Sequence, residues 1–136
     1  MKITDLKTTI VCKFFHQVTQ VPRPSKKEGK MIEFLESFAK EYKIAIKKDE
    51  AGNLLMSKPA TPGMEDRPVV VLQSHMDMVC EKNNGTKHDF DNDPIETIVD
   101  GEWLRANGTT LGADNGIGVA AELSLLASDD IQHGPI

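Results

Sequence analysis

The sequence predicts a three-layer α/β fold in which helices cover both faces of a mixed, mostly parallel sheet. The first observation is the apolar run at residues 69–72, Val-Val-Val-Leu, which suits a strand buried on both faces. The second is amphipathic helical patterning on either side of this run, because an apolar helix stripe must pack against another layer. The third is size and composition: 136 residues, 39% hydrophobic and 27% charged, are typical of one soluble globular domain.

Two helices are predicted before the central strand. The first is indicated by apolar residues at every fourth position after a Thr4-Asp5 start, namely Leu6, Ile10, Phe14 and Val18, and it should end before Pro22. The second should begin at a capping box, in which Ser25 accepts from the N3 amide and Glu28 reaches back to the cap amide. An apolar stripe at helical spacing follows, formed by Met31, Leu35, Phe38 and Tyr42.

Two β-hairpins are also predicted. Residues 44–46 and 54–56 are apolar and flank a turn that contains Gly and Asn. Residues 97–99 and 103–104 flank Asp100-Gly101, which is the strongest short-range hairpin signal in the chain. The polar stretch at 80–93 is expected to be a surface loop.

A candidate site lies where the predicted central strand ends. In an open α/β sheet, ligands collect at the carboxyl ends of the strands, and here that end carries His75 and Asp77. Alternate side chains of an extended chain share a face, so these two would lie on one side with Cα atoms about 7 Å apart. His75 could bind a cation while Asp77 orients its imidazole, although an ordinary hydrogen-bonded pair is the alternative interpretation.

The glycine-rich stretch at 107–118 leads into a predicted helix at 119–126. Such loops often bind phosphate, but here the glycines follow the order G-x-x-x-G-x-G and no Lys comes after them. Asp114 would also place negative charge where a phosphate must lie. A cation ligand therefore suits Asp114, and a plain helix N-cap is the alternative.

Charge and composition exclude several function classes. A formal net charge of -5 argues against nucleic acid, and the one basic cluster, residues 23–30, is interpreted as a solvated helix start. The charged N-terminus does not fit a signal peptide and no stretch is long enough to span a membrane, so a cytoplasmic protein is expected. Cys12 and Cys80 lack C-x-x-C spacing, so neither a disulfide framework nor a structural zinc site is predicted.

Several motifs resemble those of the aminoacyl-histidine dipeptidases, which are Xaa-His dipeptidases of the carnosinase-like, co-catalytic zinc peptidase and deacylase group. The stretches that carry the resemblance are Gln73 to Val79, Glu81 to Asn83 and Thr109 to Gly118, with shorter matches at Val21 to Ser25 and His133 to Pro135. The resemblance covers the whole chain. It implies that residues 1–136 are the N-terminal part of a zinc-peptidase-like α/β/α catalytic domain, without the rest of that domain or the lid and dimerisation domain.

The resemblance also implies roles for the candidate residues. His75 would bind one Zn²⁺, Asp114 would bridge two, and Asp77 would be the catalytic-site carboxylate that holds His75. Co²⁺ or Mn²⁺ could substitute for zinc. The intact enzyme would be a cytoplasmic homodimer that hydrolyses dipeptides, and its general base is expected in a Glu-Glu pair beyond Ile136. The chain by itself is therefore expected to be inactive.

Two other functions remain open from the sequence. The first is a deacylase of the same zinc-dependent group. Such deacylases tend to have the motif Gly-His-x-Asp-x-Val-Pro, whereas here Ser74 and Cys80 replace the Gly and the Pro. The other is a non-enzymatic module that binds a single metal or a partner. Assays with N-acyl amino acids and with Xaa-His dipeptides would separate the first two.

Overall fold

The computed structural model describes residue 3 and residues 9–136. Its elements, in chain order, are α1 (Thr9–Thr19), α2 (Gly29–Glu41), β1 (Ala45–Lys48), β2 (Leu54–Ser57), β3 (Thr97–Asp100), β4 (Trp103–Ala106) and α3 (Ala113–Ala127). The first helix ends before Pro22, as its pattern predicts. The predicted start at Thr4 and Asp5 lies outside the described residues.

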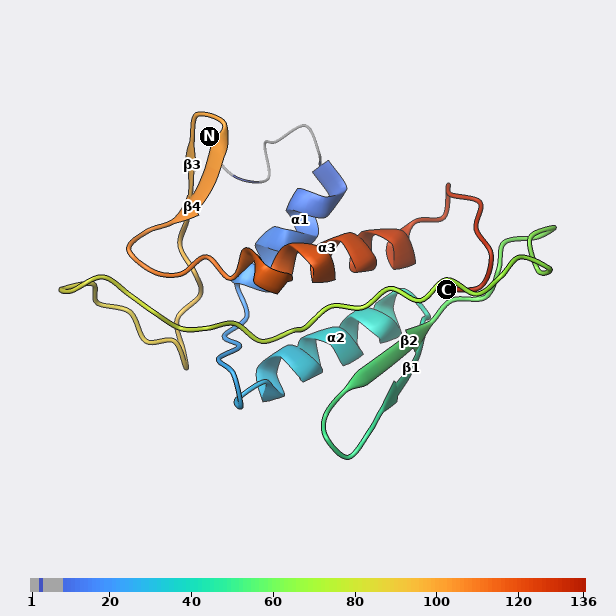
Figure 1. Cartoon of the computed structure of the whole chain (residues 1–136), viewed down its shortest axis with the longest axis horizontal. Coiled ribbons are helices and arrows are strands. Elements are labelled where there is room, and N and C mark those ends of the chain that lie inside the picture. The colour runs from blue at the N-terminus through green and yellow to red at the C-terminus, as the bar shows by residue number, and fades with distance from the viewer. Residues whose placement is uncertain (1–2, 4–8) are drawn as a thin grey trace.

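The core forms where α1 packs against α3, and α2 lies below these two helices in Figure 1. Phe14 and Val18 of α1 are buried, at 1% and 0% exposure, as the apolar spacing of the first helix predicts. The ring of Phe14 meets that of Phe38 from α2 edge to face, with centroids 5.6 Å apart. The remaining buried core residues include Met31, Leu35, Val119, Ala120, Leu123 and Leu126.

Both predicted hairpins are confirmed. Antiparallel β1 and β2 pair Lys48 with Leu54, and antiparallel β3 and β4 pair Asp100 with Trp103. Gly101 has a φ of +61°, in the left-handed region that its tight turn requires and that glycine adopts without strain.

The prediction that residues 69–72 form a buried central strand is wrong for this structure. Val70 and Val71 are 52% and 78% exposed, and residues 69–72 do not form a strand. A strand apolar on both faces becomes buried only when neighbouring strands and helices cover it. In the described part of the chain, Val70 donates to the carbonyl of Pro135 (3.0 Å), and residues 71–75 form no backbone hydrogen bonds to a neighbouring strand.

The mostly parallel sheet is likewise not formed by the described residues. The sheets are two antiparallel hairpins, and parallel pairing is limited to an isolated bridge between Pro24 and Met78. Figure 1 shows the segment 69–77 running between α3 and α2, so helices do lie on both sides of it. Ile136 and Lys58 exchange backbone hydrogen bonds of 2.9 and 3.0 Å. The three-layer arrangement stays a prediction.

The capping box predicted for the second helix is also wrong. The helix begins at Gly29, and its N-cap, Glu28, makes no side-chain capping hydrogen bond. The Glu28 carboxylate instead accepts from the amide of Lys26 (2.6 Å). The backbone of Ser25 pairs with Met78, which turns its hydroxyl toward the end of the 69–77 segment rather than toward the helix.

Among the described residues, no helix has the length and apolar character that crossing a membrane requires.

Candidate metal centre

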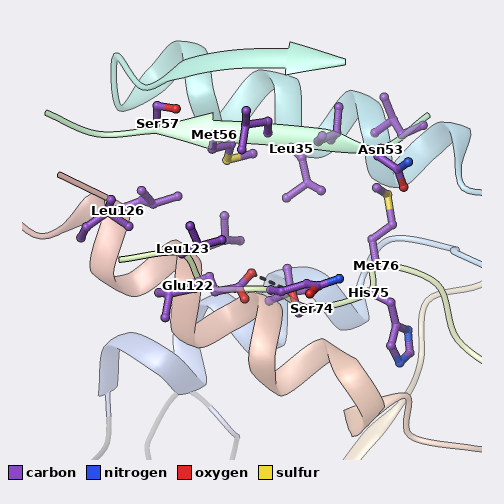
Figure 2. Close-up of a pocket in the computed structure, with 18 of the residues that line it drawn as sticks. Leu35, Asn53, Met56, Ser57, Ser74, His75, Met76, Glu122, Leu123 and Leu126 are labelled. Atoms are coloured by element: carbon purple, nitrogen blue, oxygen red, sulfur yellow. Dashed lines mark hydrogen bonds between the residues drawn. The ribbon is translucent and has the colours of Figure 1, made fainter. Parts of the chain in front are cut away.

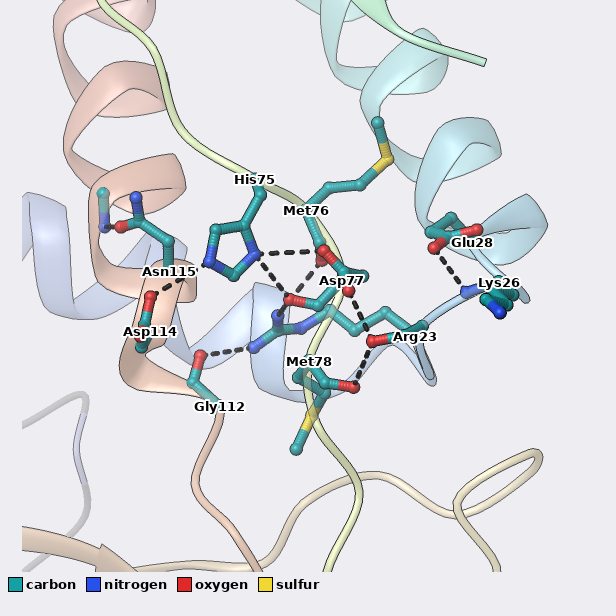
Figure 3. A network of polar contacts seen from close by, with 12 residues as sticks. Arg23, Lys26, Glu28, His75, Met76, Asp77, Met78, Gly112, Asp114 and Asn115 are labelled. Carbon is teal, nitrogen blue, oxygen red and sulfur yellow. Dashed lines mark hydrogen bonds and ion pairs between the residues drawn. The ribbon is translucent and has the colours of Figure 1, made fainter. Parts of the chain in front are cut away.

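His75, Asp77 and Asp114 come together in the structure (Figure 3). His75 Nδ1 lies 3.0 Å from Oδ1 of Asp77, and His75 Nε2 lies 3.0 Å from Oδ1 of Asp114. With the imidazole proton on Nδ1, His75 donates to Asp77 and turns the lone pair of Nε2 toward Asp114. The two segments that carry these residues are 39 positions apart in the chain and meet at one point.

Asp77 is held from both sides. Its Oδ1 faces His75, while its Oδ2 accepts a 2.5 Å hydrogen bond from the hydroxyl of Ser25. The Ser25 hydrogen bond is the main cause that lowers the pKa of Asp77, and the nearby His75 adds to it. Asp77 is therefore ionised near neutral pH and occupied as an acceptor, which suits a residue that orients an imidazole.

Asp114 does not cap a helix, so the N-cap interpretation is wrong. The N-cap of α3 is Gly112, which has no side chain to cap the helix, and the side chain that accepts from a backbone amide of the first turn is Asn115, not Asp114. Asp114 has φ -92° and ψ 103°, values outside the helical region, and its peptide bond to Asn115 is cis. Its side chain is 97% exposed, and its Oδ1 points at His75.

The pKa of His75 is raised above its ordinary value. The largest cause is the hydrogen bond to Asp114, and the backbone and side chain of Asp77 contribute further. Both ring nitrogens thus face carboxylate oxygens. The carboxylate of Asp114 stabilises a proton on Nε2, and it would stabilise a metal cation in place of that proton.

The donor geometry fits part of a zinc site. Two ligands of one tetrahedral zinc lie about 3.3 Å apart when each bond is about 2.0–2.1 Å long. His75 Nε2 and Asp114 Oδ1 are separated by 3.0 Å, so a small outward movement of Asp114, whose side chain is exposed, would admit the ion. Within residue 3 and residues 9–136, no group of three or more His, Cys, Asp or Glu side chains is arranged to hold a metal. The described residues therefore supply two donors.

Arg23 is the site residue that sequence reasoning missed. It is 1% exposed, whereas the pattern suggested a solvated helix start. Its Nη1 donates to the carbonyls of Met76 (3.1 Å) and Asp77 (3.2 Å), and its Nη2 donates to that of Gly112 (2.7 Å) (Figure 3). Burial lowers the pKa of Arg23, against the opposing effect of Asp77. The signal in the sequence was the stretch Val21 to Ser25, which contains Arg23 and is one of those that carry the family resemblance.

The glycines at positions 112, 116 and 118 have steric roles. A Cβ at Gly112 would lie 2.5 Å from Nη2 of Arg23, and one at Gly116 would lie 2.7 Å from the same atom. A Cβ at Gly118 would collide with Oδ1 of Asn115, which accepts from the Gly118 amide (3.1 Å). The loop therefore makes room for Arg23 and for a local turn.

An open, mainly apolar cleft of about 840 Å³ lies between α3 and the layer of α2 and β2. Figure 2 shows Leu123 and Leu126 facing Leu35 and Met56 across it, with His75 at one end. At this end, Ser74 donates to the Glu122 carboxylate (2.7 Å). The cleft runs along the exposed segment 69–77.

Comparisons with known proteins show what the chain as a whole is similar to. The cytosol non-specific dipeptidase of Escherichia coli (strain K12) is 47% identical over 135 residues, which make up 99% of this chain and 28% of that protein. The crystal structure of the aminoacylhistidine dipeptidase from Vibrio alginolyticus matches with a TM-score of 0.97 and 48% identity, covering 100% of this chain and 28% of that one. The resemblance to the aminoacyl-histidine dipeptidases is confirmed.

More distant structures share the fold alone. A tripeptidase from Staphylococcus aureus matches with a TM-score of 0.74 at 24% identity, over 93% of this chain and 34% of its own. An aminopeptidase from Bacillus cereus matches with a TM-score of 0.73 at 21% identity and the same coverage. A scan against models of known protein families finds no match. The chain thus has an α/β peptidase-like fold and spans about 28% of the length of the curated relative.

Proposed function

We propose that His75 and Asp114 are ligands in a zinc-dependent peptidase that hydrolyses dipeptides, of which Xaa-His dipeptides are the first class to test. The observation that carries this proposal is the 3.0 Å approach of His75 Nε2 to Asp114 Oδ1. Similarity to proteins named cytosol non-specific dipeptidase and aminoacylhistidine dipeptidase supports the peptide-hydrolase part and favours it over the deacylase alternative. It also supports a cytoplasmic location.

Each side chain has a distinct part in this proposal. Zinc, when bound, polarises the scissile carbonyl and lowers the pKa of water. Asp77 accepts from Nδ1 of His75 and so holds Nε2 in its ligating form, while Ser25 fixes Asp77. Asp114 faces His75 with Oδ1 alone, and because its side chain is 97% exposed, its other oxygen is free for a second cation. Asp77 acts through His75 and is a positioning residue, not the general base.

The described residues do not complete this site. Each zinc needs about four donors, and the structure brings together two. Both oxygens of Asp77 are occupied by His75 and Ser25, so it is unsuited to take a proton from water. We therefore propose that residues 1–136 form part of a catalytic domain, bind zinc weakly by themselves and do not turn over dipeptides, and that the intact enzyme is a homodimer.

Zinc titration by calorimetry tests the ligand assignment. His75→Ala and Asp114→Asn should abolish binding, and Asp77→Ala should weaken it by about 10–100-fold because the imidazole loses its orienting acceptor. His88→Ala is the matched control, since His88 packs on Phe90 in the loop at 80–93. Unchanged zinc affinity in a folded His75→Ala variant would contradict the assignment.

A turnover assay tests the reaction. Residues 1–136 and the product of the complete open reading frame are compared on Xaa-His dipeptides and on N-acyl amino acids, both with added zinc. We expect dipeptide hydrolysis by the complete product and none by residues 1–136, since a missing positioned base alone costs about 10²–10⁴-fold. Preference for N-acyl amino acids would identify a deacylase instead.

A further inference from the structure

Neither proposed ligand is held in place by packing of its own side chain. The side chain of His75 is 51% exposed and that of Asp114 is 97% exposed. Their separation therefore depends on how firmly the backbone of residues 75–77 is fixed to the backbone that enters α3. Exposed side chains on unanchored segments would sample many separations, and a metal site would lose affinity accordingly.

We propose that Arg23 is the positioning residue that holds these two segments at their ligating separation. This rests on the proposed function of His75 and Asp114. The guanidinium donates through Nη1 to the carbonyls of Met76 and Asp77, and through Nη2 to that of Gly112, two residues before Asp114. Because its nitrogens form a rigid planar fork, the three carbonyls are fixed relative to one another.

The surroundings of Arg23 fit this role. A charged group at 1% exposure requires strong compensation, and here it comes from carbonyls of both segments. Gly112 and Gly116 leave the space that the fork occupies, because a Cβ at either position would lie within 2.7 Å of Nη2. The start of α3, from Gly112 to Gly116, is thus shaped around Arg23 independently of the hydrogen bonds.

Lysine cannot take over this role of Arg23. Its ammonium is a single point on a flexible stem, so it can reach one segment but cannot fix the angle between two. The informative variants are therefore Arg23→Lys, which keeps the charge and the approximate length, and Arg23→Met, which keeps the apolar stem. Arg105→Met is the matched control, because Arg105 pairs with Asp100 on the exposed β3–β4 hairpin.

The test uses two readouts on protein whose folding is checked by circular dichroism. The first is the zinc dissociation constant, measured by chelator competition with zinc alone as the probe. The second is the long-range ¹H–¹⁵N spectrum of the His75 imidazole in metal-free protein, which reports the contact of Nε2 with Asp114. We expect both Arg23 variants to weaken zinc binding by about 10–100-fold and to lose the Asp114-dependent imidazole signal, with Arg105→Met unchanged.

The outcomes separate this inference from the proposed function. Wild-type affinity in a folded Arg23→Lys variant overturns the role of Arg23 and leaves the ligand assignment standing. Failure of the wild-type protein to bind zinc overturns the ligand assignment, and the imidazole signal then decides the role of Arg23: its loss in Arg23→Lys supports positioning, and its persistence does not. If neither variant folds, Arg23 is required for the fold itself and the positioning role is overturned.

Discussion

At the scale of single residues, the site is set by hydrogen bonds that determine which atoms face outward. His75 would be free to present either ring nitrogen without Asp77, and Asp77 would be free to rotate without Ser25. The contact between His75 Nδ1 and Asp77 (3.0 Å) and the hydrogen bond from Ser25 to Asp77 (2.5 Å) fix both side chains. They turn Nε2 of His75 toward Asp114. Ser25 therefore serves the site rather than the helix that follows it.

The shifted pKa values predict how stability depends on pH in metal-free protein. The pKa of His75 is raised, chiefly by Asp114, so its contribution is fully present below its unfolded value, about 6.5, and is lost as the pH rises through the folded value. The pKa of Asp77 is lowered, chiefly by Ser25, so its contribution is present above its unfolded value, about 3.9, and is lost as the pH falls through the folded value.

Urea denaturation with chelator present measures this effect. The difference in the free energy of unfolding between wild type and His75→Gln should shrink as the pH rises from about 6 to about 9. The Ser25→Ala variant should lose its difference from wild type at the acidic end instead. A His75→Gln difference that is independent of pH would mean that the imidazole gains no proton affinity on folding.

At the scale of elements, the entry into α3 decides whether Asp114 can face His75. The helix begins after Gly112, whose φ of +72° turns the chain, and Asp114 and Asn115 leave the helical region before regular helix resumes. The turn packs directly on Arg23 and Phe15, so its glycines are steric requirements rather than phosphate contacts.

Substitution of Gly116 should show this requirement. In Gly116→Ala, the new Cβ would lie 2.7 Å from Arg23 Nη2 and 3.1 Å from Phe15 Cε2, so we expect a loss of about 1–3 kcal/mol in the free energy of unfolding. Gly29→Ala, at the first residue of α2, is the control: a Cβ there meets nothing within 4 Å, so the free energy of unfolding should not fall. Urea denaturation measures the free energy of unfolding of both variants, and equal changes in the two would rule out the steric explanation.

At the scale of the whole molecule, the most unusual feature is a run of exposed apolar residues. Val69, Val70, Val71 and Leu72 are 66%, 52%, 78% and 43% exposed, beside an open apolar cleft. An extended segment with unpaired backbone groups and apolar side chains is a template for pairing with another chain.

We expect this segment to drive self-association of residues 1–136. Val71→Lys should reduce the associated fraction, since a charge on such a segment opposes pairing. Trp103→Lys is the control, because Trp103 is similarly exposed, at 76%, but lies on the β3–β4 hairpin. Sedimentation velocity over a range of concentrations measures the effect. An equal reduction by both variants would indicate general hydrophobic association instead.

Local patterns predicted most of the elements. The helices followed from apolar spacing and the hairpins from turn chemistry, because both depend on residues close together in the chain. Asp114 was recognised as a cation ligand candidate by the charge it brings to a glycine-rich loop. The capping box failed because Ser25 had a distant competitor, Asp77, for its hydroxyl.

The sequence alone determined the helices, the two hairpins, the peptidase resemblance and the identity of the candidate ligands. The tertiary structure decided that His75 and Asp114 meet, that a buried Arg23 joins their segments, and that residues 69–72 stay exposed. The reason is physical: helix and turn formation depend on neighbours in the chain, whereas burial and long-range hydrogen bonds depend on which distant segments arrive at the same place.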